Sequence, residues 1–103
     1  MDSGRTLEIL QGRVGGKVMF LEGPGAVPFF GILRFRVYDT KFTLNLSHYF
    51  EVVGNDGDII SFSHTDVDFF FKDEALGINQ DTIYGQPYSG NCFTHRKGNE
   101  IKK

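Results

Sequence analysis

The sequence predicts a small, mostly-β domain: a five-stranded antiparallel barrel with a short N-terminal helix and an irregular C-terminal extension. Apolar and polar residues alternate through residues 17–71, with the period of two that is typical of β-strands. Turn signals rich in Gly, Pro, Asn and Asp separate the alternating segments. The 103 residues include 11 Phe and no Trp, so most rings are expected to fill a core. Closure of the sheet would remove exposed edges.

The first two elements are expected to be a helix and a buried strand. Residues 6–10 are predicted to form a short helix capped by Ser3, with an additional strand as the alternative. Residues 17–21 contain the run Val-Met-Phe-Leu, which indicates a strand that is buried on both faces. Residues 22–25, Glu-Gly-Pro-Gly, then supply the backbone angles of a turn.

Residues 27–38 are predicted to form a long, half-buried strand. Alternation directs one set of its side chains inward, namely Phe29, Leu33, Phe35 and Val37. Arg34 and Arg36 then point outward as a basic stripe. Gly31 indicates a bulge or a sharp bend, because glycine inside a strand usually marks one.

Three further strands follow, separated by turn signals. They are expected at residues 41–46, 49–53 and 59–63, and the last continues after a bend into 67–71. Asp39-Thr40 is expected to form a tight connection before the first of them. Asn55-Asp56-Gly57-Asp58 indicates a hairpin, because Asp-Gly accepts the positive φ angles of a type I′ turn.

The organisation of the chain follows from these elements. We expect a barrel domain at residues 1–75 and a C-terminal extension at 76–103 that is packed on the barrel or partly disordered. The single cysteine, Cys92, excludes an internal disulfide. The longest apolar stretch, 26–33, is far shorter than the roughly 20 residues of a membrane helix, and no signal peptide is visible. We therefore expect a cytoplasmic protein that does not bind membranes.

Charge is distributed unevenly along the chain. The formal net charge is −2, yet residues 43–91 contain eight acidic side chains and one basic side chain, Lys72. Both ends of the chain are basic. An acidic segment repels phosphate backbones, so this half is not expected to form a nucleic-acid surface.

Two short motifs indicate a family of small barrels. Gly31-Ile32-Leu33 precedes Asp39-Thr40-Lys41-Phe42, and this order resembles the Sm-like family, which includes Sm and LSm proteins and bacterial Hfq. The resemblance implies a small barrel and RNA binding. Thr43 stands where Sm proteins keep an Asn that contacts RNA bases. Phe62-Ser63-His64 lacks the Lys of the Tyr-Lys-His motif in Hfq.

A second, shorter resemblance covers eight residues. Ile60-Ser61-Phe62-Ser63-His64-Thr65-Asp66-Val67 is similar to the end of the Sm-like domain in Rho-binding antiterminators, the Rof family, and Leu7-Glu8-Ile9 corresponds to their early helix. The resemblance implies an acidic protein that blocks the RNA-binding surface of a termination factor. The N-terminal Cys-Asp-x-Tyr pattern of that family is absent, and the tail after Phe71 has no counterpart there.

The first functional hypothesis is a non-catalytic protein-interaction or inhibitor module that binds a basic partner. Its candidate residues lie on an acidic, aromatic surface: His64, Asp66, Asp68 and Phe70. Asp66 and Asp68 are expected to share one face of a strand. At least one ring of Phe69-Phe70-Phe71 must lie on the outer face, where a second subunit or the folded-back tail would cover it.

The alternative hypothesis is binding of RNA or a nucleotide. Arg34, Arg36 and Lys41 could pair with phosphates while Tyr38 or Phe30 stacks on bases. The arginines could equally pair with acidic residues of the same barrel or of a neighbouring subunit.

A third hypothesis is a small hydrolase in which His64 acts with Asp66. A histidine at a strand end can also simply cap backbone groups. We assign no catalytic residue, no metal ligand and no cofactor from the sequence.

Overall fold

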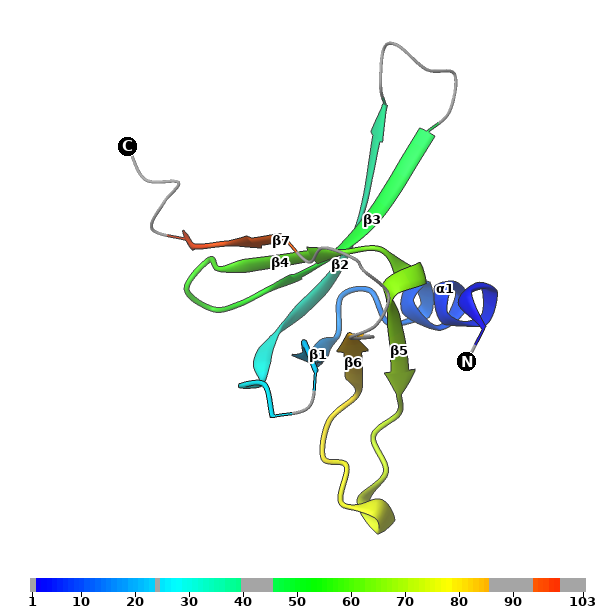
Figure 1. The fold of residues 1–103 in the computed structure, drawn as a ribbon, viewed down its shortest axis with the longest axis vertical. Coiled ribbons are helices and arrows are strands. Elements are labelled where there is room, and N and C mark those ends of the chain that lie inside the picture. The colour runs from blue at the N-terminus through cyan, green and yellow to red at the C-terminus, as the bar shows by residue number, and fades with distance from the viewer. Residues whose placement is uncertain (1, 24, 40–45, 86–93, 99–103) are drawn as a thin grey trace.

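One curled sheet forms the main body of the protein. The structure, a computed structural model, describes residues 2–23, 25–39, 46–85 and 94–98 (Figure 1). The order of elements is α1 (Ser3–Gly12), β1 (Lys17–Leu21), β2 (Phe29–Asp39), β3 (Leu46–Val53), β4 (Ile59–Phe62), the 3₁₀ turn η1 (His64–Asp66), β5 (Val67–Phe70), the 3₁₀ turn η2 (Glu74–Leu76), β6 (Thr82–Gly85) and β7 (Thr94–Arg96). The prediction of a mostly-β chain with one short helix near its start is confirmed for this described part.

The predicted five-stranded, fully antiparallel closed barrel is wrong. The strands follow the order β5-β6-β1-β2-β3-β4-β7, and the pair β1–β6 is parallel. The sheet therefore curls into a half-barrel that has β5 at one edge and β7 at the other (Figure 1). Strand β6 inserts between β5 and β1 and adds the parallel pair, while β4 pairs with β7 on its outer side and not with β5. Residues 76–103, expected as an extension, contribute both β6 and β7 to the sheet.

Helix α1 begins one residue earlier than the predicted cap implies. The carboxylate of Asp2 accepts a hydrogen bond from the backbone N–H of Arg5 at 2.9 Å, so Asp2 is the N-cap and Ser3 is the first helical residue. Leu10 is fully buried, and the helix contacts η1 and β5. Within the described ranges, no helix is long and apolar enough to cross a membrane.

Strand β2 is bent because it pairs with two different neighbours. Residues 29–32 pair with β1, and residues 32–39 pair with β3. The register passes through Gly31 without a skipped residue, so this glycine marks a close approach rather than a bulge. A Cβ atom at Gly31 would lie 2.7 Å from the carbonyl carbon of Val53 and 2.9 Å from Cγ1 of Val52. Close contact between β2 and β3 therefore requires glycine here.

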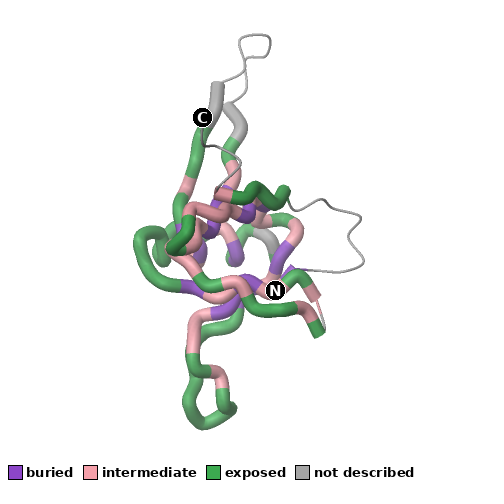
Figure 2. The backbone as a smooth tube through the Cα atoms, turned by 90° about the vertical axis from the view of Figure 1, so that its left-hand side faces the viewer, coloured by how far each residue is buried: buried purple, intermediate pink, exposed green. Residues whose placement is uncertain are grey.

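Beyond this bend, the inward pattern predicted for β2 is only partly correct. Leu33 is buried, and Phe29 and Phe35 pack against the core. Val37, however, is 54% exposed, because β2 and β3 extend beyond the core as an arm (Figure 2). We call this extension the β2–β3 arm.

Strands β3 and β4 form the hairpin that the sequence predicted. The N–H of Gly54 donates to the carbonyl of Asp58 at 2.8 Å, so the hairpin between β3 and β4 is confirmed. The expected type I′ turn is wrong, because it requires positive φ at both central residues and only Gly57, with a φ of 88°, has one, whereas Asp56 does not. The strand predicted at 41–46 falls outside the described residues except for Leu46, which begins β3. The strand predicted at 49–53 is the second part of that same β3.

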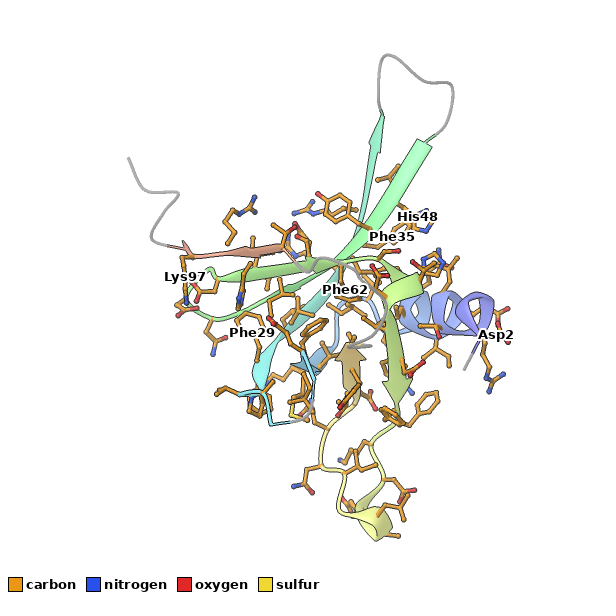
Figure 3. The ribbon with its side chains drawn as sticks, viewed as in Figure 1. Asp2, Phe29, Phe35, His48, Phe62 and Lys97 are labelled. Atoms are coloured by element: carbon orange, nitrogen blue, oxygen red, sulfur yellow. The ribbon has the colours of Figure 1, made fainter. Side chains whose placement is uncertain are left out.

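Phenylalanine rings fill the concave side of the sheet. The ring centroids of Phe20 and Phe62 lie 5.1 Å apart, and those of Phe50 and Phe62 lie 5.9 Å apart (Figure 3). The fully buried aliphatic residues around them are Leu10, Val18, Leu33, Val52, Ile60, Val67 and Ile83. Phe69 also faces this core, whereas Phe70 is exposed on the opposite face, as strand alternation requires. Phe71 follows the end of β5 and is also exposed, with its ring centroid 5.1 Å from that of Phe69.

Candidate binding surface

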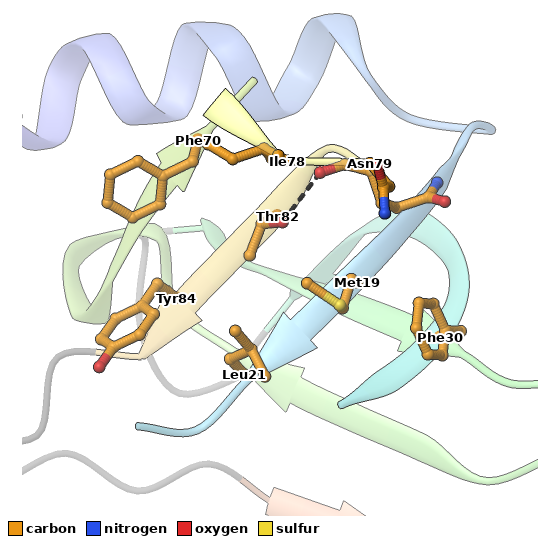
Figure 4. Close-up of a pocket in the computed structure, with 10 residues that line it drawn as sticks. Met19, Leu21, Phe30, Phe70, Ile78, Asn79, Thr82 and Tyr84 are labelled. Atoms are coloured by element: carbon orange, nitrogen blue, oxygen red, sulfur yellow. Dashed lines mark hydrogen bonds between the residues drawn. The ribbon is translucent and has the colours of Figure 1, made fainter. Parts of the chain in front are cut away.

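An apolar groove crosses the convex face of the sheet over β5, β6, β1 and β2. Its volume is about 390 Å³ (Figure 4). The lining residues are Met19, Leu21, Phe30, Phe70, Gly77, Ile78, Asn79, Gln80, Thr82 and Tyr84. Phe70 and Phe30 lie toward opposite ends of the groove, with the side chains of the two central strands between them. We call this feature the convex groove.

Alternation along each strand places these side chains on the convex face. Val18 and Phe20 point into the core, so Met19 and Leu21 point outward. On β6, Ile83 is buried and Tyr84 points outward. The sheet register aligns these outward positions, because the residues opposite Tyr84 are Leu21 on β1 and Asp68 on β5.

The rims of the groove expose large apolar side chains. Phe30 is 58% exposed and Phe70 is 46% exposed. The ring of Phe70 meets that of Tyr84 edge to face, with centroids 6.3 Å apart. Exposed aromatic side chains around a concave, apolar surface are typical of ligand or partner sites.

Two polar side chains of the groove floor, Gln80 and Thr82, form hydrogen bonds within the chain. The amide nitrogen of Gln80 donates to the carbonyl oxygen of Lys17 at 3.1 Å. The hydroxyl of Thr82 donates to the carbonyl oxygen of Gln80 at 2.9 Å (Figure 4). These bonds reduce the polarity of the groove floor, so an apolar occupant can cover it without breaking them.

The wall formed by β5 and η2 is acidic. Residues 67–80 contain Asp68, Asp73 and Glu74 against one basic residue, Lys72. The ammonium of Lys72 lies 3.8 Å from the carboxylate of Glu74, and both side chains are exposed. Asp73 uses one carboxylate oxygen to accept from the N–H of Ala75, which caps η2. An excess of negative charge therefore borders one side of the groove.

The structure brings together two of the four residues predicted for protein binding. Phe70 lines the groove, and Asp68 lies two residues earlier on the same face of β5. His64 and Asp66 instead lie in η1, which contacts α1. The expectation that Asp66 and Asp68 share a strand face is wrong, because the hydroxyl of Ser63 accepts from the N–H of Thr65 and turns the chain before β5 begins.

His64 forms a stacked pair with His48 at the base of the β2–β3 arm. Their ring centroids lie 5.3 Å apart with an interplanar angle of 15°, and His48 also contacts Phe35 at 5.5 Å (Figure 3). Nδ1 of His64 is buried without a hydrogen-bond partner within the described part of the chain. Burial lowers the pKa of His64, the neighbouring His48 lowers it further, and Asp66 partly opposes these effects.

This lowered pKa predicts that acid destabilises the fold. The unfolded chain has an ordinary histidine pKa of about 6.5 and binds the proton more readily than the folded chain. The free energy of unfolding should therefore fall as the pH drops from about 7.5 through 6.5 and toward the folded-state pKa. Thermal unfolding followed by circular dichroism at pH 7.5 and 5.5 measures this loss.

Two variants isolate the contribution of the histidine pair. His64→Gln should show a smaller loss of melting temperature between the two pH values, because its side chain does not titrate. His48→Gln should reduce the loss partly, because it removes the neighbouring positive charge. An equal loss in the wild type and His64→Gln would contradict the assignment.

The basic stripe is partly neutralised within the sheet. Nε of Arg36 lies 2.9 Å from Oε1 of Glu51, which is a buried carboxylate on β3. This hydrogen bond and the charge of Glu51 raise the pKa of Arg36. Arg34 is exposed on the same face of β2. The side chain of Tyr38 and all of Lys41 fall outside what the structure describes.

Sequence reasoning identified Phe70 but missed most of the groove. Met19, Leu21 and Tyr84 were not singled out as site residues. The expectation that residues 17–21 are buried on both faces is wrong, because Val18 and Phe20 face the core while Met19 and Leu21 line the groove. The strand order decides which outward-facing side chains lie next to one another. Because β6 was not predicted, the sequence could not place Tyr84 beside Leu21.

Within the described residues, no group of three or more His, Cys, Asp and Glu side chains is placed to hold a metal ion. Comparisons with known proteins also give no lead to a ligand or an activity. No protein-family model, curated protein or solved structure matches this chain.

Proposed function

We propose that this chain is a non-catalytic protein-interaction module that holds an apolar segment of a partner in the convex groove. The observation that carries the proposal is the exposure of Phe30 and Phe70 on either side of an apolar depression. Large exposed apolar side chains beside a concave surface are typical of partner sites, because covering them removes apolar surface from water. The acidic wall beside the groove supports a partner with basic character.

The expected affinity of the groove rests on these two rings. Covering the exposed part of each ring stabilises a complex by about 1 kcal/mol. Their combined loss corresponds to a decrease in affinity of at least about tenfold. Since both side chains already point outward, replacing them leaves the buried core unchanged.

We therefore predict that the double variant Phe30→Ser/Phe70→Ser loses a partner that the wild type captures. The measurement is affinity capture from a lysate of the source cells, quantified for proteins and for nucleic acid. The captured protein should fall at least about tenfold in the double variant. Val37→Ser is the matched control, because Val37 is similarly exposed but lies on the β2–β3 arm.

Three outcomes would contradict this function. A captured protein that is retained by the double variant would show that the groove is not the site. Enrichment of RNA that is lost in Arg34→Ala would favour nucleic-acid binding through the basic stripe. A wild type that sediments as a dimer, with a monomeric double variant, would show that a second copy of the chain occupies the groove.

A further inference from the structure

We infer that the segment bound in the convex groove is amphipathic and basic, with apolar side chains flanked by lysine or arginine. This inference rests on the proposed function and adds the chemistry of the partner. The apolar part follows from the lining, in which Met19, Leu21, Phe30, Phe70 and Ile78 present hydrocarbon surface. The basic part follows from the charges beside it.

The negative charge borders the groove on the side of Phe70. Asp68 lies on the same face of β5 as Phe70 and is directly opposite Tyr84, although it also interacts within the chain. Asp73 and Glu74 are exposed on the connection that leads from β5 to the groove residue Ile78. A cation on the partner would approach these carboxylates while its neighbouring apolar side chain contacts Phe70.

A positive charge at the start of β1 limits where a basic residue of the partner can lie in the groove. Lys17 is exposed at the start of β1, next to Gln80 of the groove floor. The Lys17 ammonium repels a cation there, so the basic residues of the partner belong beside β5 and η2. The groove thus favours basic over acidic segments of equal apolarity.

Two synthetic peptides test this preference. In the first, Leu-Phe-Leu is flanked on each side by two lysines, and in its twin glutamates replace the lysines; both peptides carry blocked ends. Titration into the isotopically labelled full chain, followed by backbone NMR shifts, should show at least about fivefold tighter binding of the lysine peptide at low salt. The shifted signals should include Leu21, Phe70 and Tyr84.

Two charge-reversal variants test whether the acidic wall of the groove causes the preference for the lysine peptide. Asp68→Lys should reduce the ratio between the two affinities at least about threefold. Glu8→Lys changes the net charge equally but lies on α1, away from the groove, so it should leave the ratio nearly unchanged. Phe70→Ser should weaken the binding of the lysine peptide.

The outcomes separate this inference from the proposed function. Equal binding of both peptides, weakened equally by Phe70→Ser, would overturn the basic preference and leave the groove as a docking site for apolar segments. Tighter binding of the glutamate peptide, or no binding of either peptide, would also overturn the inference. The proposed function fails separately, when Phe30→Ser/Phe70→Ser retains the partner captured from cells.

Discussion

Phe50→Ala is expected to destabilise the fold by about 3–5 kcal/mol, because it opens a cavity in the centre of the core. Phe50 has no exposed surface, and its ring lies 5.1 Å from that of Phe35 and 5.9 Å from that of Phe62. Both neighbours belong to strands that pair with β3, so the cavity would weaken contacts on each side. Domains of this size are commonly stable by only 5–15 kcal/mol.

Urea unfolding followed by circular dichroism measures this loss as a lower midpoint at an unchanged slope. Val37→Ala is the matched control, because Val37 lies on the neighbouring strand with its side chain largely exposed. Its free energy of unfolding should stay within about 0.5 kcal/mol of the wild type. A Phe50→Ala variant with the wild-type midpoint would mean that Phe50 is not in the core.

The local elements could be predicted because their signals lie within a few residues of one another. The apolar run Val18-Met19-Phe20-Leu21 lies within five consecutive residues, and it gave the bounds of β1 although not the face that each side chain occupies. The Asp-Gly pair at residues 56–57 likewise gave the β3–β4 hairpin. Ordinary sterics of the backbone decide both features, so no knowledge of distant contacts was needed.

The strand order could not be predicted because it depends on contacts between distant segments. Strand β6 has four residues, Thr82–Gly85, and lies in a polar, glycine-rich part of the chain. Its pairing partner, β1, ends sixty residues earlier, so no local pattern links the two. The same insertion brings Tyr84 beside Leu21 and completes the groove. The candidate site was therefore less predictable than the strands that carry it.

Gly31→Ala is expected to destabilise the fold by about 3 kcal/mol, although it adds only one methyl group. The added Cβ would overlap the carbonyl oxygen of Val53 and would lie 2.7 Å from the carbonyl carbon of that residue. These atoms belong to the backbone of β3, so a change of side-chain rotamer cannot relieve the contact. Relief requires β2 and β3 to separate where β2 changes partner, next to the buried Leu33.

Gly23→Ala is the control, because a Cβ at Gly23 would meet no atom within 4 Å. Its urea midpoint should equal or slightly exceed that of the wild type, since alanine restricts the unfolded chain. A Gly31→Ala variant with the wild-type midpoint would show that the two strands are not in close contact at this bend. Phe30 immediately precedes Gly31 and lines the groove, so Gly31→Ala should lose stability and peptide binding together. Phe70→Ser should weaken binding alone, and this difference separates damage to the sheet from damage to the surface that it presents.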